Sequence, residues 1–251
     1  MQRLLALGYA LVAYLVFFAT FLWLVAFLAD FSLAPTTVDN AVNGASLARA
    51  MVVDLALIAL FGLQHSVMAR PRFKARWTKF VPPSVERSTY VVAASIALAL
   101  LLRFWHTVDG EIWDLRGTAM EPVLWLVFAA GWTVLFISTF LINHFELFGL
   151  TQAWFHGRER DAAPPKLREP LFYRYVRHPL YLGFTIAFWA TPHMTMSHLF
   201  FAIGLQVYIL IGIAHEERDL IAYFGPDYED YRTRVGMLIP GIGRRKRTPA
   251  S

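Results

Sequence analysis

The chain has 251 residues, of which 57% are hydrophobic and only 16% are charged, and its mean hydropathy is +0.46. In soluble domains about a quarter of the residues are charged, so this composition excludes a water-soluble domain and predicts an all-α integral membrane protein. The absence of cysteine excludes disulfides, iron–sulfur clusters and thiolate zinc sites. The net charge of +5 gathers in three connecting segments, so we expect no nucleic-acid partner.

Four long apolar segments follow one another from the N-terminus. The first, residues 4–29, contains no charged residue and exceeds the roughly 20 residues that a helix needs to cross a bilayer. A cleaved signal peptide has an apolar region of only about 7–15 residues, so we expect a retained span. Residues 47–69, 90–105 and 122–142 predict three further spans.

The last apolar segment, residues 180–214, is interrupted at Thr191-Pro192-His193. Proline lacks a backbone donor and ends the preceding helix, which predicts a helical hairpin whose first arm is too short to cross the bilayer unless it tilts. The chain then has five spans, or six with one short arm, plus short cytoplasmic helices. We expect one membrane domain with a four-span bundle at 1–142, a cytoplasmic loop at 143–179, and the hairpin with a C-terminal segment at 180–251.

Basic residues predict the orientation in the membrane. They gather between the second and third spans, between the fourth span and the hairpin, and at the C-terminus, whereas the opposite loops are neutral or acidic. By the positive-inside rule, the basic loops and both termini face the cytoplasm, as in an inner-membrane protein. These basic residues are Arg70, Arg72, Lys74, Arg76, Lys79, Arg87, Arg158, Arg160, Lys166, Arg168, Arg174, Arg177, Arg244, Arg245, Lys246 and Arg247.

The first polar cluster opens the hairpin, and it is a candidate site because polar side chains are costly inside a bilayer. Arg177 and His178 precede Pro179, which suits the first turn of a helix. A helix N-terminus favours an anionic group such as a carboxylate. The alternative is that Arg177 and His178 only anchor the helix at the interface, and that Gly183 only permits close helix packing.

A second polar cluster closes the hairpin. The adjacent carboxylates of Glu216 and Glu217 can bind ribose hydroxyls or an ammonium group, or they can form a solvated last turn paired with Arg218. Tyr228 and Tyr231 are three residues apart and therefore share one face of a short helix. A face of tyrosines can hold a cation over its rings, although such pairs also serve as interface packing.

A third polar cluster follows the fourth span. Asn143, His144 and Glu146 stand there among aromatic residues that continue to Trp154. These polar groups are candidates for an acceptor site, and the alternative is an interfacial belt with aromatic anchors.

The joint order of these motifs is more specific than any one of them. The chain carries RHPLYLG, an apolar hairpin, EERDL, FGPDYEDYRTRV and a terminal IPG. This order resembles the membrane methyltransferases related to isoprenylcysteine carboxyl methyltransferase. Nearly the whole chain is similar to the nurim-like branch of that family, through LQHSVMARPRFKARWTKFVPPSVERSTYV and INHFELFGLTQAWFHGRE.

The resemblance implies that S-adenosylmethionine is the methyl donor and is enclosed at the cytoplasmic face by the hairpin and the C-terminal segment. It implies a small thiol as the acceptor, methanethiol in the first place, which would yield dimethyl sulfide. The cofactor-binding residues that it implies are Arg174, Arg177, His178, Tyr181, Gly183, Glu216, Glu217, Tyr228 and Tyr231.

Within this set, Arg177 or Arg174 is expected to pair with the methionine carboxylate. The acidic pair would take the ribose hydroxyls or the amino group, and Tyr181 and Tyr231 would face the sulfonium. His144 and Glu146 are the candidates for a base, with His65 next. A narrow acceptor pocket is expected to be lined by Phe145, Trp154 or Trp189, and no metal ion is expected in the site.

Three alternatives remain open. The same fold could methylate a prenyl-cysteine, a lipid or another thiol. Histidines near span ends could instead bind haem if they face one another across the bundle, the candidates being His65, His106, His144 and His178. The third alternative is a non-catalytic membrane scaffold.

Overall fold

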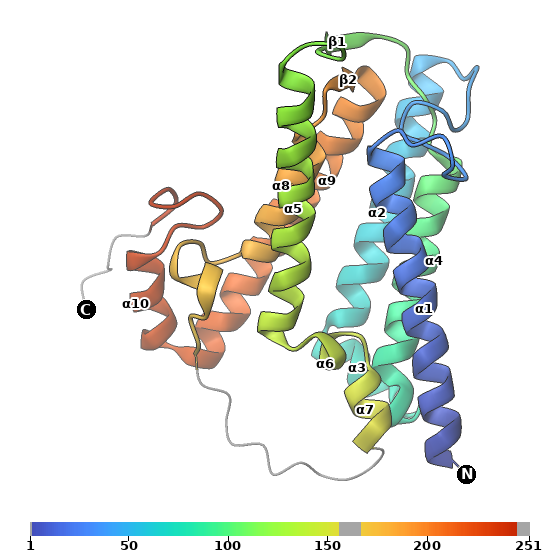
Figure 1. Ribbon diagram of the computed structural model, residues 1–251. Coiled ribbons are helices and arrows are strands. Elements are labelled where there is room, and N and C mark those ends of the chain that lie inside the picture. The colour runs from blue at the N-terminus through green and yellow to red at the C-terminus, as the bar shows by residue number, and fades with distance from the viewer. Residues whose placement is uncertain (1, 156–166, 245–251) are drawn as a thin grey trace. The chain divides into compact units, whose positions relative to one another are not determined.

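The computed structural model describes residues 2–155 and 167–244, and these residues fold almost entirely into helices (Figure 1). Five of the described helices are long and apolar enough to cross a membrane, which confirms the predicted all-α integral membrane fold. They are α1 (Gln2–Leu28), α2 (Leu47–Ala69), α4 (Pro83–Phe104), α5 (Met120–Ile142) and α9 (Met196–Phe224).

Shorter elements connect the long helices. They are α3 (Pro71–Trp77), β1 (Glu111–Asp114), α6 (His144–Leu147), α7 (Leu150–Phe155), the 3-10 helix η1 (Leu171–Arg174), α8 (Pro179–Trp189), β2 (His193–Thr195) and α10 (Pro226–Arg234). Six of the basic residues used to predict orientation lie outside the described residues: Arg158, Arg160, Lys166, Arg245, Lys246 and Arg247.

The predicted start of the third span was wrong, because α4 begins at Pro83 rather than at residue 90. A proline at the first helical position leaves no hydrogen bond unmade, so it favours a helix start. The first turns carry polar residues that hide them from a hydropathy reading, yet Ser84 and Ser88 are buried. Packing against the rest of the fold therefore extends this helix beyond its apolar run.

The predicted hairpin is confirmed in its first arm and corrected in its second. Helix α8 has 11 residues, or about 16 Å, which is too short to cross a hydrocarbon core of about 30 Å. After Pro192 the chain forms β2, which pairs antiparallel with β1. Helix α9 does not end near residue 214 but continues to Phe224, where Gly225 follows with a φ of 55°. Glu216 and Glu217 therefore belong to the last membrane helix itself.

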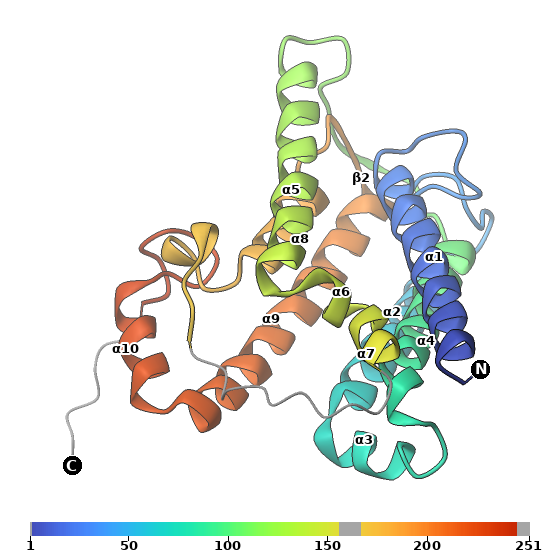
Figure 2. The same cartoon turned by 60° about the horizontal axis from the view of Figure 1, so that its bottom comes forward.

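The described residues form two compact units. The first comprises residues 2–121, 143–155 and 191–205, and the second comprises residues 122–142, 167–190 and 206–244. In the first unit α4 packs between α1 and α2, and α7 packs against α1 and α4 (Figures 1 and 2). The second unit holds α5, α8, α10 and the last part of α9. The predicted division into a four-span bundle, a loop and a hairpin remains a prediction.

Small residues and aromatic rings make the core of the first unit. Ala6 and Ala10 of α1 are buried with Ala153 of α7, so these helices approach closely. Further along α1, the ring of Phe17 stacks on Phe148 with centroids 4.0 Å apart. These contacts hold α7 and the connection before it against the N-terminal helix.

In the second unit, α5 and α8 cross at two glycines. A Cβ atom on Gly183 would lie 2.7 Å from the carbonyl oxygen of Gly131 and 2.7 Å from the backbone nitrogen of Leu135. A Cβ atom on Gly131 would in turn lie 3.0 Å from the carbonyl oxygen of Gly183. Since both neighbours are backbone atoms, which cannot move aside, glycine is required for this approach.

We therefore expect Gly183→Ala to lower the free energy of unfolding by about 1–3 kcal/mol, because the added methyl group overpacks the crossing. Thermal unfolding of the purified protein in detergent measures this loss. Gly8→Ala is the matched control, since a Cβ atom there meets nothing within 4 Å, and it should keep or slightly raise the stability. Equal unfolding temperatures for the wild type and Gly183→Ala would refute the crossing.

Candidate active site around Arg177 and Glu217

The C-terminal segment folds against the residues that begin α8. Backbone nitrogens of Arg177 and His178 donate to the carbonyl oxygens of Gly236 (2.8 Å) and Met237 (3.2 Å). A Cβ atom on Gly236 would come within 2.8 Å of the nitrogen of Gly241, so the tight turn after α10 requires glycine there. These backbone contacts bring the RHP motif against the residues that directly precede the IPG motif, within one unit.

The guanidinium group of Arg177 is the centre of the site. It is buried, and its Nε donates to Glu217 Oε1 at 2.8 Å while Nη2 lies 2.6 Å from the same oxygen. Its Nη1 donates to the carbonyl oxygens of Val235 (2.5 Å) and Gly243 (3.3 Å). A buried charge needs such partners, and the planar fork of arginine reaches several at once. Every nitrogen of this side chain is thus engaged within the chain.

The two adjacent carboxylates have different environments. Glu217 is nearly buried, and besides Arg177 it meets Arg232 Nε at 3.2 Å and His178 Nε2 at 3.3 Å. Glu216 keeps 45% of its side chain exposed, and its Oε2 lies 3.7 Å from His178 Nδ1. The imidazole of His178 therefore stands between both carboxylates, with Glu217 tied into the fold and Glu216 facing outward.

Two tyrosines of α10 form the wall next to this pair, which confirms the prediction that they share one helix face. The rings of Tyr228 and Tyr231 have centroids 5.7 Å apart, and the hydroxyl of Tyr231 donates to the carbonyl oxygen of Tyr173 at 2.6 Å. Burial raises the pKa of both hydroxyls, which therefore keep their protons at neutral pH. The hydroxyl of Tyr228 is buried and has no hydrogen-bond partner among the described residues.

A buried hydroxyl without a hydrogen-bond partner lowers the folding stability by about 1–3 kcal/mol, and such a group is explained if a bound ligand supplies the partner. The hydroxyl of Tyr228 also lies in the field of Glu216, Glu217 and Arg177. A ligand that carries hydroxyl, amino or carboxylate groups would satisfy it. This tyrosine is the strongest single indication of a bound molecule in the second unit.

The remaining residues predicted for the cofactor site, and Trp189 of the predicted acceptor pocket, lie on η1 and α8. The ring of Tyr181 lies beside His178 with centroids 5.8 Å apart, and its hydroxyl reaches toward Gly212 of α9. Arg174 is exposed at the end of η1, and Trp189 is half-buried in the last turn of α8. Gly183 lies at the crossing with α5, where it serves helix packing.

The predicted base residues belong to the first unit. His144 is buried, and its Nε2 shares a hydrogen bond of 2.9 Å with the hydroxyl of Tyr14. Desolvation lowers the pKa of His144, so its imidazole is neutral at pH 7 and is chemically competent to accept a proton. Glu146 is exposed and accepts a hydrogen bond of 2.6 Å from Asn143 Nδ2.

The predicted acceptor residues of the first unit lie at its surface or between its helices. Phe145 and Trp154 are exposed and line an apolar groove of about 260 Å³. The other residues of this groove are Leu7, Leu150, Thr151 and Phe155. His65 of α2 shares a hydrogen bond of 2.9 Å with the hydroxyl of Tyr90.

Sequence reasoning missed three residues of these sites. Arg232 pairs with Glu217, Tyr173 receives the hydrogen bond of Tyr231, and Tyr14 pairs with His144. Arg232 stands one turn after Tyr228 in the DYRTRV motif, and that spacing is a usable signal. Tyr173 and Tyr14 carry no such signal, because their roles arise from tertiary contacts across 58 and 130 residues of sequence.

Each histidine considered for haem ligation has a different neighbour. His65 and His144 contact tyrosines, His178 contacts the acidic pair, and His106 Nδ1 lies 3.5 Å from Asp54 Oδ1. Because each of these imidazoles contacts a different side chain, their arrangement does not favour a pair of histidines that bind one haem.

Replacing Arg177 by lysine tests the central ion pair. A single ammonium group cannot reach Glu217 and the two carbonyl oxygens together, so buried acceptors are left unsatisfied at a cost of about 1–3 kcal/mol. We expect Arg177→Lys to lower the unfolding temperature in detergent, whereas Arg218→Lys, on the exposed side of the same turn as Glu217, should leave it unchanged. The same small effect for both variants would contradict the assignment.

Comparisons with known proteins complete the description. A family model described as NnrU protein matches residues 54–238. A protein of Mycobacterium tuberculosis named methanethiol S-methyltransferase is 50% identical over 96% of this chain and 98% of its own length. One of the same name from Crocosphaera subtropica is 44% identical, over 98% of this chain and 95% of its own length. Human nurim is 28% identical over 72% of this chain and 71% of its own length. No solved structure matches the chain.

Proposed function

Since the chain belongs to the NnrU protein family, we propose that it is a multi-pass membrane enzyme that methylates methanethiol to dimethyl sulfide. The observation that carries this proposal is the shared name of relatives that are 44–50% identical along nearly the whole chain. Identity of this degree over nearly the whole chain supports a common reaction and a common acceptor. It disfavours the alternatives of a haem subunit or a prenyl-cysteine acceptor.

S-adenosylmethionine is the proposed methyl donor, and it would supply an electrophilic methyl group on a positively charged sulfur. The residues of the second unit suit its chemistry. Glu216 offers a half-exposed carboxylate for ribose hydroxyls or the amino group, and the buried hydroxyl of Tyr228 offers a donor without a protein partner. Arg174 is exposed and can pair with the methionine carboxylate. Tyr181 and Tyr231 supply rings for the cation.

Arg177 and Glu217 take a different part in this proposal than the resemblance implied. Their charges neutralise each other inside the chain, and their hydrogen bonds fix α9, α10 and the C-terminal turn. We assign them as positioning residues, which hold Glu216, His178 and Tyr228 in place. The role of pairing with the methionine carboxylate passes to Arg174.

The acceptor must lose a proton, because the thiolate and not the thiol is the nucleophile. His144 is the proposed base: it is neutral at pH 7 and is oriented by the hydroxyl of Tyr14. Glu146 and His65 are the further candidates. The base would take the thiol proton, and the thiolate sulfur would form a bond to the methyl carbon. The bond from that carbon to the donor sulfur would break, with its electron pair staying on the donor sulfur, which leaves as a neutral thioether.

We propose that the chain lies in the inner membrane. In the proposed orientation, the basic connections and both termini face the cytoplasm. Described basic residues that support it include Arg72, Lys74 and Arg76 of α3. The donor is charged and does not cross hydrocarbon readily, so it would reach the site from the aqueous side, which in this orientation is the cytoplasm. Methanethiol is small and apolar enough to reach the protein from the bilayer.

The direct test offers methanethiol and methyl-labelled S-adenosylmethionine to the purified protein in detergent. We expect labelled dimethyl sulfide in the headspace, measured by gas chromatography, and none when either compound is left out. Binding of the donor without release of labelled dimethyl sulfide would rule out methanethiol as the acceptor. A protein that binds no donor at all would reject the enzymatic proposal.

A pair of matched variants tests the cofactor site. Tyr228→Phe removes a hydroxyl that has no protein partner, so stability should hold while affinity for S-adenosylmethionine falls about fivefold, the value of about one hydrogen bond. Tyr231→Phe removes the hydrogen bond to Tyr173 and should lower the stability even without ligand. Calorimetric titration and thermal unfolding measure the two effects. Unchanged affinity in Tyr228→Phe would remove this hydroxyl from the site.

A further inference from the structure

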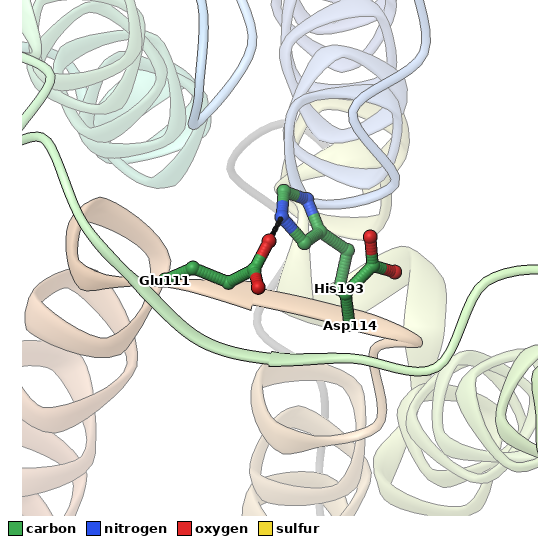
Figure 3. A group of neighbouring side chains, drawn as sticks. All are labelled: Glu111, Asp114 and His193. Atoms are coloured by element: carbon green, nitrogen blue, oxygen red, sulfur yellow. Dashed lines mark hydrogen bonds and ion pairs between the residues drawn. The ribbon is translucent and has the colours of Figure 1, made fainter.

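The two-stranded sheet of the first unit carries a cluster of metal-binding side chains that the proposed reaction does not use. In the described part of the chain, Glu111, Asp114 and His193 form a group in which one donor atom of each lies within 4.8 Å of the others (Figure 3). Glu111 and Asp114 come from β1, and His193 comes from β2. The cluster is separate in sequence and in fold unit from the Arg177 site.

An irregularity in the strand pairing creates this cluster. Glu111 pairs with Thr195, Trp113 with Met194, and Asp114 with His193, so β1 has one more residue than β2 between its outer pairs. Side chains alternate between the faces of a strand, and residues 111 and 114 would lie on opposite faces of a regular one. The extra residue is a β-bulge, which returns Glu111 to the face of Asp114 and His193.

The distances suit a small cation. Glu111 Oε2 lies 3.2 Å from His193 Nε2. Two ligands that each bind zinc at about 2.0–2.2 Å in a tetrahedral arrangement are themselves about 3.3–3.6 Å apart. Figure 3 shows these two groups directed toward each other, with the carboxylate of Asp114 beside the histidine. Glu111 and His193 already have the spacing of two ligands of one ion, and the donor atom of Asp114, within 4.8 Å of both, would join them by side-chain rotation.

A second layer of contacts orients the ligands. Asp39 Oδ2 lies 3.7 Å from His193 Nδ1, and Asp39 Oδ1 accepts a hydrogen bond of 2.5 Å from the hydroxyl of Thr195. A carboxylate on the far nitrogen of a histidine is the usual support of a metal-bound imidazole. Arg116 donates from its backbone nitrogen (3.0 Å) and its Nε (2.8 Å) to Asp114 Oδ1, and from its Nη2 (2.6 Å) to Oδ2. Oδ2 thus accepts one hydrogen bond from Arg116 and is the oxygen of Asp114 with a second lone pair for an ion.

From this arrangement we propose that Glu111, Asp114 and His193 bind one divalent transition-metal cation of the zinc class. One imidazole nitrogen with carboxylate oxygens selects such an ion over magnesium or calcium, which prefer oxygen ligands alone. The cluster contains the carboxylates of Glu111, Asp114 and Asp39 and one guanidinium group, that of Arg116. The carboxylates outnumber the guanidinium group, so the site has the net negative charge that a dication needs. The proposal does not depend on the methyltransfer reaction.

The ion would act as a clamp. An isolated two-stranded sheet is marginally stable, and this one joins the α4–α5 connection to the turn between α8 and α9. Two hydrogen bonds to backbone carbonyl oxygens already support this sheet. Trp113 Nε1 donates to Thr191, and the backbone nitrogen of Leu115 donates to Pro192. A bound cation would add a cross-link between both strands and raise the unfolding temperature.

Zinc titration of the tag-free full chain in detergent tests the site, with calorimetry for affinity and thermal unfolding for stabilisation. We expect saturable binding at this site, at least about tenfold weaker in Glu111→Gln and His193→Ala, and a zinc-dependent rise in unfolding temperature that both variants lose. Asp109→Asn removes the same charge from the same loop outside the cluster and should bind as the wild type does.

Absence of saturable zinc binding by the wild type would overturn the proposal, as would full affinity in both ligand variants. Equal weakening by Asp109→Asn would also overturn it, because binding would then follow loop charge alone. Should His193→Ala fail to fold, Glu111→Gln still decides the question, since the side chain of Glu111 is 56% exposed and its loss leaves the fold intact.

Discussion

The second unit is organised by the burial of one charge, the guanidinium group of Arg177. A buried arginine needs carboxylate and carbonyl oxygens around it. The chain supplies these from Glu217 of α9, from Arg232 in the last turn of α10, and from Val235 and Gly243 after that helix. Because these partners lie 40 to 66 residues after Arg177 in the sequence, their hydrogen bonds to this one group bring the end of the last span, the short tyrosine helix and the C-terminal segment together. The outward-facing Glu216 and the unpaired hydroxyl of Tyr228 follow from that convergence.

Two kinds of close approach allow this arrangement. Gly131 and Gly183 let α5 and α8 cross with their backbones in contact, and Gly236 lets the C-terminal turn close on itself. The ion pair supplies the attraction and the glycines supply the space. The first unit is held together differently. Alanines and stacked rings lie in the contacts that α1 makes with α7 and the residues before it, and the bulged pair β1 and β2 lies at the other end of α1 (Figure 1).

The sequence predicts well what hydropathy and spacing control. The spans, the short first arm of the hairpin and the shared face of Tyr228 and Tyr231 all follow from local patterns. It does not predict what tertiary packing decides. The start of α4 at Pro83 depends on the burial of Ser84 and Ser88, and the extension of α9 to Phe224 carries the buried Glu217. The hydrogen bonds of Arg177 to Val235 and Gly243 form because the C-terminal segment folds back on α8. For the same reason the cluster of Glu111, Asp114 and His193 could not be foreseen, since a bulge and an 82-residue separation create it.

The coupling between Arg177 and Glu217 is the most direct measure of this account. A double-mutant cycle with Arg177→Met, Glu217→Gln and the double variant, followed by unfolding in detergent, isolates their interaction from the effect of each change alone. The account predicts a coupling free energy above about 1 kcal/mol, with the double variant less destabilised than the sum of the single ones. Additivity within about 0.5 kcal/mol would show that the two groups act independently and would contradict the proposed organisation of the site.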